Sequence, residues 1–259
     1  MRIAELSAPE VAARIAEGCA VLLPMGSTET HGPALPMGDY LFAEGIAMHI
    51  ARSAGDVLVA PPLAFGGADF FRGVPGGVAL STPTLTALVT EILVALHEGG
   101  ARRILIINGH GGNIPAIEDA QRALRHRHGA IIPVLHLWKS AGAWQTELGG
   151  SPDALGHGGD PVASVGMHLR PDLCQPALLR PRAAPEPFLG LPVSGFGTIR
   201  APAGDAGVDF GVPIELPEIA PGGVQAKDPS GANPELGARI VARHVAAATA
   251  LLAAMKAPA

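Results

Sequence analysis

Four short, mainly apolar runs lie in the first 138 residues of the chain, and each is typical of a buried strand. They are Cys19–Met25, Val57–Ala60, Arg103–Asn108 and Ile131–Trp138. The runs are rich in Val, Ile and Leu and do not alternate with polar residues. This pattern indicates parallel strands that are covered by helices on both faces of a sheet.

Segments with helical spacing of apolar residues lie between these runs. They span residues 39–54, 84–98 and 115–128, and the second ends at a Gly-Gly pair. Gly at the end of such a segment is a stop signal for a helix. Strands that alternate with helices predict the α/β class, here a three-layer α/β/α fold with a mainly parallel central sheet.

The rest of the chain predicts one further helix and no second domain. Pro and Gly recur every few residues in 171–233, whereas 234–256 has apolar residues at helical spacing. We interpret 171–233 as a loop excursion that lines a pocket or a subunit contact, and 234–256 as a terminal helix. Because no repeat or charged linker divides the chain, residues 1–259 are expected to form a single domain.

Composition narrows the class of protein. Of 259 residues, 48% are hydrophobic and 16% are charged, which is enough apolar material for a sizeable core. A net charge of −5 gives no footprint for nucleic acid or for an anionic membrane surface. Two cysteines, Cys19 and Cys174, and a start without an apolar leader predict a cytoplasmic protein. The longest apolar stretch, 245–255, is too short to cross a bilayer.

Three candidate metal ligands follow the first apolar run. Residues 24–40 read P-M-G-S-T-E-T-H-G-P-A-L-P-M-G-D-Y and place Glu29, His31 and Asp39 beyond the carboxyl end of a predicted strand. Ligands of open α/β sheets bind at that edge, and two carboxylates with an imidazole suit Zn²⁺, Mn²⁺ or Fe²⁺. Two alternatives stay open, a simple hydrogen-bonded Glu–His pair and Asp39 as the N-cap of the next helix.

The third run ends in a similar way. It leads directly into N-G-H-G-G-N, residues 108–113, so His110 is expected at the same edge of the sheet. Asn108 and Asn113 have short amide side chains that can brace a tight turn. The alternative is an anion-binding loop at a helix N-terminus, but the segment lacks both the G-x-G-x-x-G spacing and a P-loop Lys.

A third Gly-rich segment, L-G-H-G-G-D-P-V-A-S at 155–164, offers His157 and Asp160. Taken alone, it is equally typical of an N-capping Asp and a surface His. His136, near the end of the fourth run, is ambiguous. Solvated helical faces are expected for the remaining histidines, His49, His97, His126, His128, His168 and His244.

Together these segments resemble the creatininase (creatinine amidohydrolase) family. The resemblance is carried by G-S-T-E-T-H-G-P-A-L-P, G-D-Y-L-F-A-E, N-G-H-G-G-N and G-H-G-G-D, and by residues 75–81 and 227–237. It implies a creatininase-like fold, two divalent metal ions per chain, hydrolysis of amide-type C–N bonds in a small molecule, and assembly as a homohexamer.

The resemblance also implies roles for individual residues. Glu29 and His110 match ligands of one metal, His31 matches a ligand of the second, and Asp39 matches the bridging carboxylate. His157 matches the histidine that transfers a proton near the scissile bond.

Two departures from the family pattern bear on the substrate. Creatinine-hydrolysing members resemble N-G-H-Y-E-N at the second motif, where this chain has Gly111 and Gly112, so one ligand of the second metal is missing. Asp160 is the expected replacement, with Glu118 as a second candidate. Compared with the creatinine-hydrolysing members that the chain resembles, the interval from His31 to Asp39 is also one residue shorter. Both differences argue against creatinine itself as the substrate.

The predicted function is therefore that of a dinuclear amidohydrolase acting on a small cyclic amide or a formamide. Two metals about 3.5–4 Å apart can share a water and lower its pKa toward ~7, which supplies a bridging hydroxide as the nucleophile. Trp138 and Trp144 either close over a flat substrate or only pack, and Arg72 and Arg200 are candidates to face an anionic substrate.

Three alternatives stay open. Two are other branches of the family, a deformylase of a formamidopyrimidine nucleotide and a peptidase. The third is a non-catalytic small-molecule binding protein whose second metal site has decayed.

Overall fold

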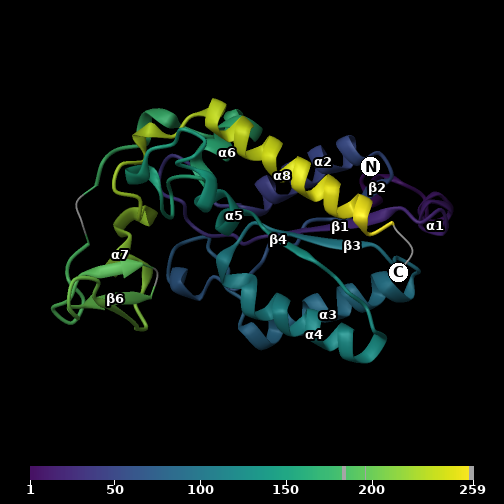
Figure 1. Cartoon of the computed structure of the whole chain (residues 1–259), viewed down its shortest axis with the longest axis horizontal. Helices are drawn as coiled ribbons and strands as arrows, with labels where there is room; N and C mark the ends of the chain where they lie inside the picture. The colour runs from purple at the N-terminus through teal and green to yellow at the C-terminus, as the bar shows by residue number, and fades with distance from the viewer. Residues whose placement is uncertain (183–184, 196, 257–259) are drawn as a thin grey trace.

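A parallel four-stranded sheet lies at the centre of the computed structural model, which describes residues 1–182, 185–195 and 197–256 (Figure 1). Its order is β2 (Val57–Val59), β1 (Ala20–Met25), β3 (Ile104–Asn108) and β4 (Val134–His136). Residues 183–184, 196 and 257–259 belong to the expected domain but lie outside the described residues.

Helices cover both faces of this sheet, so the predicted three-layer α/β/α fold is confirmed (Figure 1). One layer contains α2 (Tyr40–Ala54), α5 (Leu137–Trp144), α6 (Val162–Leu169) and α8 (Pro234–Ala254). The other contains α3 (Thr82–Glu98) and α4 (Ile114–His128), with α1 (Ala8–Ala16) packed beside them. Successive strand residues alternate between the layers, since Leu22 packs into the first core and Leu23 into the second.

Most predicted boundaries hold to within two residues, and one is wrong. The predicted strand Ile131–Trp138 is a strand only over β4, because the chain turns into α5 at Leu137. A further shift lies at α3, which begins two residues before the predicted start because Ser81 accepts a hydrogen bond from the backbone N–H of Thr84.

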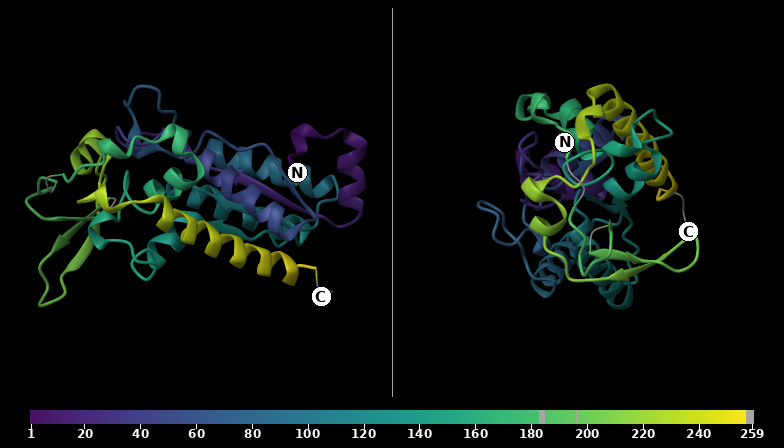
Figure 2. Two further views of the ribbon diagram at one scale, coloured as in Figure 1. Left: turned by 90° about the horizontal axis from the view of Figure 1, so that it is seen from above. Right: turned by 90° about the vertical axis from the view of Figure 1, so that its left-hand side faces the viewer.

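A second, antiparallel sheet lies at the end of the molecule away from both termini (Figures 1 and 2). It consists of β5 (Val193–Gly195), β6 (Thr198–Ala201) and β7 (Val208–Gly211), followed by the short α7 (Leu216–Ile219). Ile199 of this sheet shares a small apolar core with Phe71, from the segment that follows β2. The Pro/Gly-rich excursion therefore packs against a loop of the main sheet.

The terminal helix α8 is long and apolar enough, by length and composition alone, to cross a membrane. In the structure it packs along α6 and α2 and buries residues such as Ile240 and Leu252, as a core helix of a globular protein does. His244 is buried on this helix against Trp144, with ring centroids 5.0 Å apart, so its expected place on a solvated face is wrong.

Candidate metal centre

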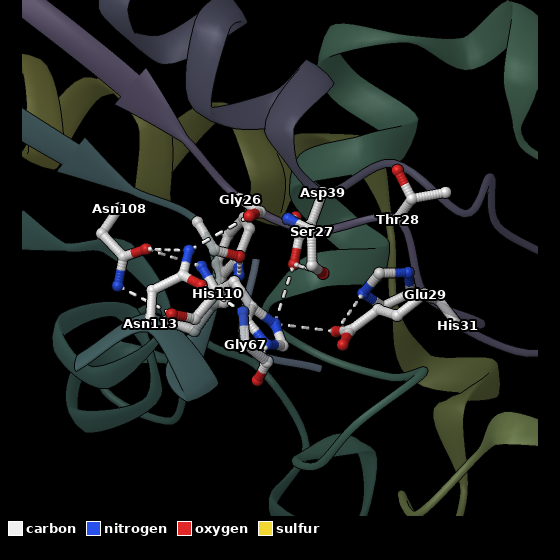
Figure 3. Close-up of polar contacts among 12 residues, drawn as sticks. Gly26, Ser27, Thr28, Glu29, His31, Asp39, Gly67, Asn108, His110 and Asn113 are labelled. Carbon is white, nitrogen blue, oxygen red and sulfur yellow. Dashed lines mark hydrogen bonds and ion pairs between the residues drawn. The ribbon is translucent and has the colours of Figure 1, made fainter. Parts of the chain in front are cut away.

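The carboxyl ends of β1 and β3 lie side by side and deliver polar residues to one place. Met25 and Asn108, the last residues of these strands, are partners in the parallel register. The loop that follows β1 carries Glu29 and His31, and His110 comes two residues after β3 (Figure 3). The structure thus brings together side chains that are about eighty residues apart in sequence.

Glu29, Asp39 and His110 form the first of two buried groups. His110 Nδ1 lies 3.1 Å from Glu29 Oε1 and 3.3 Å from Asp39 Oδ2. The three candidate ligand atoms all lie within 4.8 Å of one another. Two carboxylates and an imidazole at this spacing can hold a divalent cation.

The second group shares Glu29 and adds His31 and His157. Glu29 Oε1 lies 3.4 Å from His31 Nε2 and 4.0 Å from His157 Nδ1. The two imidazole rings are stacked, with centroids 4.8 Å apart and an interplanar angle of 19°. Glu29 is therefore the carboxylate common to both groups, whereas the resemblance implies Asp39 as the bridging carboxylate.

The three histidines share one arrangement. Each donates a ring N–H to a backbone carbonyl, which can only accept, and the other ring nitrogen lies on the side of Glu29. The donating atoms are His31 Nδ1 to Pro36 at 3.3 Å, His110 Nε2 to Gly67 at 3.1 Å, and His157 Nε2 to Thr30 at 2.6 Å. Histidines that bind metal ions are oriented in this way.

Asp39 is held in place by the start of its own loop. The Ser27 backbone N–H donates to Asp39 Oδ1 at 2.5 Å and the Ser27 hydroxyl donates to Oδ2 at 3.1 Å. Asp39 stands at the N-cap position of α2, as the alternative proposed, but its side chain makes no capping hydrogen bond to the helix. Ser27 lies within the G-S-T-E-T-H-G-P-A-L-P motif, but nothing in the sequence indicates that it holds Asp39, twelve residues further along the chain.

Asn113 braces the turn that carries His110, as predicted. Its amide donates to the carbonyl oxygen of Gly26 and to Asn108 Oδ1, each at 3.1 Å, and its oxygen accepts from the Gly67 N–H at 2.9 Å (Figure 3). The turn after β3 and the loop after β2 are thereby fixed to each other.

Burial and mutual charge shift the pKa values of these groups. Burial raises the pKa of Asp39. Burial alone would also raise the pKa of Glu29, but the charge and hydrogen bond of His110 and the hydrogen bond of His31 hold it below its usual range. Burial would lower the pKa of His110, but the charge of Glu29 and a hydrogen bond to Asp39 raise it well above its usual value. Burial, together with the charge of His31, lowers the pKa of His157 to about 4.

The environment of Glu29 Oε2 shows whether a cation fits between these groups. Glu29 Oε2 is buried and, among the described residues, no group donates a hydrogen bond to it. A buried carboxylate oxygen without a donor costs free energy, and a bound divalent cation would remove that cost. The residues present therefore fit a metal ion.

Backbone packing accounts for the Gly at position 112. A Cβ there would overlap the carbonyl oxygen of Gly67 and would lie 2.6 Å from His110 Nε2, so no side chain fits without movement. A Cβ at Gly111 would meet nothing within 4 Å. The carboxylate of the N-G-H-Y-E-N pattern is thus sterically excluded in this chain.

Neither expected replacement for that carboxylate reaches the two groups. Asp160 is buried, but its Oδ1 accepts from the hydroxyl of Ser164 at 2.5 Å and its Oδ2 from Gln145 at 3.1 Å. Glu118 is exposed on α4. Within the described residues, neither belongs to a possible metal group, and the structure gives Asp160 a bracing role between α5 and α6.

The two predicted substrate-binding tryptophans lie in different places. Trp138 lines a cavity of about 540 Å³ next to Glu29 and His157, and its indole N–H donates to the carbonyl of Gly109. Trp144 is not among the described residues that line this cavity and packs against His244 instead, so its predicted substrate contact is not supported.

Comparison with known proteins points to one family. The Creatininase family model, described as creatinine amidohydrolase, matches residues 4–252. The mycofactocin precursor peptide peptidase of Mycolicibacterium smegmatis is 34% identical over 160 residues, which are 59% of this chain and 58% of that protein. The creatinine amidohydrolase of Pseudomonas putida is 35% identical over 138 residues, 48% of this chain and 52% of that protein. In these matches the chain spans little more than half the length of each relative.

Solved structures agree over the whole chain. A crystal structure of creatinine amidohydrolase (creatininase) has a TM-score of 0.78 at 25% identity and covers 100% of this chain and 98% of its own. A mutant creatininase described as Zn-Zn type has a TM-score of 0.75 at 26% identity, with 99% and 98% coverage. The structure described as "Creatininase Mn" has the same fold, with a TM-score of 0.78, 24% identity and 99% coverage of both chains.

Proposed function

This chain belongs to the creatininase family, and from that premise we propose that it is a metal-dependent hydrolase of a C–N bond in a small amide or formamide. The observation that carries the proposal is the arrangement around Glu29. Three histidines, His31, His110 and His157, donate to backbone carbonyls and direct their other nitrogens toward this carboxylate.

Each buried group would hold one divalent ion, and Glu29 would contact both. Asp39 and His110 complete the first site, while His31 and His157 complete the second. Mixed imidazole and carboxylate ligands favour Zn²⁺, with Mn²⁺ or Fe²⁺ as alternatives. Two such ions polarise an amide carbonyl and lower the pKa of water, which provides a nucleophile at neutral pH.

The chain's own residues prepare this chemistry. Ser27 keeps Asp39 in place through two hydrogen bonds, and the Gly67 carbonyl fixes the ring of His110. The Thr30 carbonyl holds the N–H of His157, which sets Nδ1 as the nitrogen that faces Glu29. We therefore assign His157 as a metal ligand in place of the excluded carboxylate at 112, and not as the proton-transfer group implied by the resemblance.

Metal content and activity test this proposal together. Protein loaded with Zn²⁺ or Mn²⁺ and then desalted should retain two ions per chain by mass spectrometry and hydrolyse simple formamides and cyclic amides. His157→Ala should retain one ion, and Glu118→Ala, which changes an exposed residue of α4, should retain two. If His157→Ala binds two ions but loses turnover, His157 transfers a proton and is not a metal ligand. No bound metal in the unaltered protein would favour the non-catalytic alternative.

A peptidase is the second candidate function. The M. smegmatis relative is a peptide peptidase and is 34% identical over the matched segment. The open space at Gly111 supports it, because a longer substrate can approach where the creatinine-hydrolysing pattern has a Tyr. Cleavage of short peptides, measured by mass spectrometry, would separate this activity from formamide hydrolysis.

Assembly and location also belong to the proposal. A homohexamer and a cytoplasmic site of action follow from the family resemblance and from the composition, respectively. Sedimentation velocity tests the first and cell fractionation the second.

A further inference from the structure

The cavity beside the two metal groups is lined by aromatic and apolar residues, here called its wall, and by polar residues of those groups, here called its floor. Phe70, Phe71, Trp138 and Val162 belong to this wall, and the histidines and Glu29 lie at the floor. A volume of about 540 Å³ is in the range of small-molecule sites, which extends from roughly 300 to 1,000 Å³.

Two members of the wall are fixed in position. The Phe71 ring lies 4.7 Å from that of His157 and is buried in the small core that it shares with Ile199 of β6. The indole N–H of Trp138 is held by the carbonyl of Gly109. Phe70 is the accessible member, with 37% of its surface exposed. A preformed wall of this kind binds a flat apolar group without paying an entropy cost for ordering side chains.

The charge of the cavity lining bears on which substrates it accepts. Among the described residues that line the cavity, none is Lys or Arg. Arg72, one of the two arginines considered for an anionic substrate, is paired with Asp69, with Nη2 2.9 Å from Oδ1. The other, Arg200, is paired with Asp209 at 2.7 Å. A phosphate or carboxylate against the wall would lose its water without gaining a counter-charge.

We infer that the substrate carries an uncharged, apolar and preferably aromatic group next to its scissile amide, and that Phe70 determines this specificity. The inference rests on the proposed hydrolase function. The apolar group packs between Phe70 and Trp138, while the amide lies at the floor near Glu29. The lack of cations among the described lining residues argues against a nucleotide substrate, and thus against the deformylase branch.

Four probes with the same scissile bond test this preference. N-formylphenylalanine amide, N-formylalanine amide, N-formylaspartic acid α-amide, which keeps a free β-carboxylate, and N-formylphosphoserine amide differ only in the group beside the formamide. Zinc-loaded protein should release formate from the aromatic probe with a kcat/KM about tenfold above that for alanine, and should turn over the two anionic probes more slowly still.

A matched pair of Phe variants tests the role of Phe70. Phe70→Ala should raise KM for the aromatic probe about tenfold, leave kcat within about twofold, and raise KM for the alanine probe by a smaller factor than for the aromatic probe. Phe210→Ala removes a similarly exposed ring on β7 that does not line the cavity, and it should match the unaltered protein.

Failure of the inference can be distinguished from failure of the hydrolase proposal. The inference would be overturned if the aspartate or phosphoserine probe were turned over as fast as the aromatic probe or faster. It would also be overturned if Phe70→Ala left KM for the aromatic probe unchanged. Either result would leave the hydrolase proposal intact. If no probe is hydrolysed, the hydrolase proposal fails for formamides. Binding of the same probes, measured by calorimetric titration, then tests the inference. Tighter binding of the aromatic than of the phosphoserine probe, weakened in Phe70→Ala, would support it, and equal binding would reject it.

Discussion

Glu29 lies at the point where the two candidate metal groups meet. Its Oε1 is within 4.0 Å of a nitrogen of each of three histidines, and its Oε2 has no donor among the described residues. If each group holds one ion, as proposed, a substitution at Glu29 affects the binding of both ions. A substitution at His31 then affects the binding of one ion only.

Glu29→Gln should abolish binding of both ions, because an amide is a much poorer ligand than a carboxylate and the shared anionic contact is lost. Affinity should fall by more than the 10–100-fold that is typical of losing an outer hydrogen-bond partner of a ligand. Metal titration with a colorimetric chelator checks this, with circular dichroism to confirm the fold. Retention of one ion at full affinity would show that Glu29 is not shared.

Gly112 and Gly111 form a matched pair at adjacent positions. Gly112→Ala should destabilise the fold by about 1–3 kcal/mol, because the added methyl overlaps the Gly67 carbonyl and forces a backbone shift. It should also weaken metal binding at His110, which donates to the same carbonyl. Gly111→Ala, with nothing within 4 Å, should change the free energy of unfolding little. Equal stability of the two variants in urea melts would contradict the close approach of the two backbones.

At the scale of elements, the α8 helix shows how a pattern can mislead. Its apolar residues predict a helix correctly, but His244 follows a polar Arg, and the pattern therefore favours a solvated position. The helix is instead covered on several sides, by α6, α2 and α5, so even this titratable position is buried. Helix periodicity reports one buried face and does not report how many neighbours a helix has.

Acid sensitivity should trace in part to His244. Burial lowers its pKa to about 4, below the usual value of about 6.5 in an unfolded chain. The unfolded state therefore binds more protons in this interval, so the contribution of His244 to stability is complete above about pH 6.5 and is lost as the pH falls through 4. The loss amounts to at most about 3 kcal/mol.

His244→Leu removes this titration and should flatten the fall in unfolding free energy between pH 6.5 and 4. Urea denaturation at several pH values checks the slope. His126→Leu, a change at an exposed position of α4, serves as the control and should leave the slope as it is. A slope that is identical in His244→Leu and the unaltered protein would contradict a neutral, buried His244.

A sequence pattern does not show which elements contact one another, and this decides how much of the site can be predicted. Strand ends are predictable from apolar runs, so the sequence alone places Glu29, His31 and His110 at one edge of a sheet. The environment of Asp160 is not predictable in this way, because Ser164 reaches it from α6 and Gln145 from the end of α5. The hydrogen bond from His110 to the backbone carbonyl of Gly67 is not predictable either, because the sequence pattern describes side chains and not backbone positions.

At the scale of the whole molecule, the metal groups are buried among loops that follow different strands and helices. Ions held there bind the folded state and would hold these loops together. Such binding stabilises a protein by about 2.7 kcal/mol when the free ion is at 100 times its dissociation constant. For a protein of this size that corresponds to a rise in Tm of roughly 5–10 °C.

Removal of metal should accordingly lower the Tm. Protein treated with EDTA and then dialysed should unfold about 5–10 °C below the Zn²⁺-loaded form, and added Zn²⁺ should restore the difference. Differential scanning calorimetry measures both, with Glu29→Gln as a control that should not respond to Zn²⁺. An equal Tm with and without Zn²⁺ in the unaltered protein would argue against both sites.

The antiparallel sheet at the far end of the molecule has a consequence for how new specificities can arise. Phe71 is anchored by Ile199 of that sheet, whereas the candidate ligands are anchored by the parallel sheet and its loops. One residue of the cavity wall thus depends on a different sheet from Glu29, Asp39 and His110. If the substrate site is as proposed, laboratory evolution directed at residues 193–211 would retune which molecules are accepted while leaving these three ligands in place, much as antibody loops diversify on a constant framework.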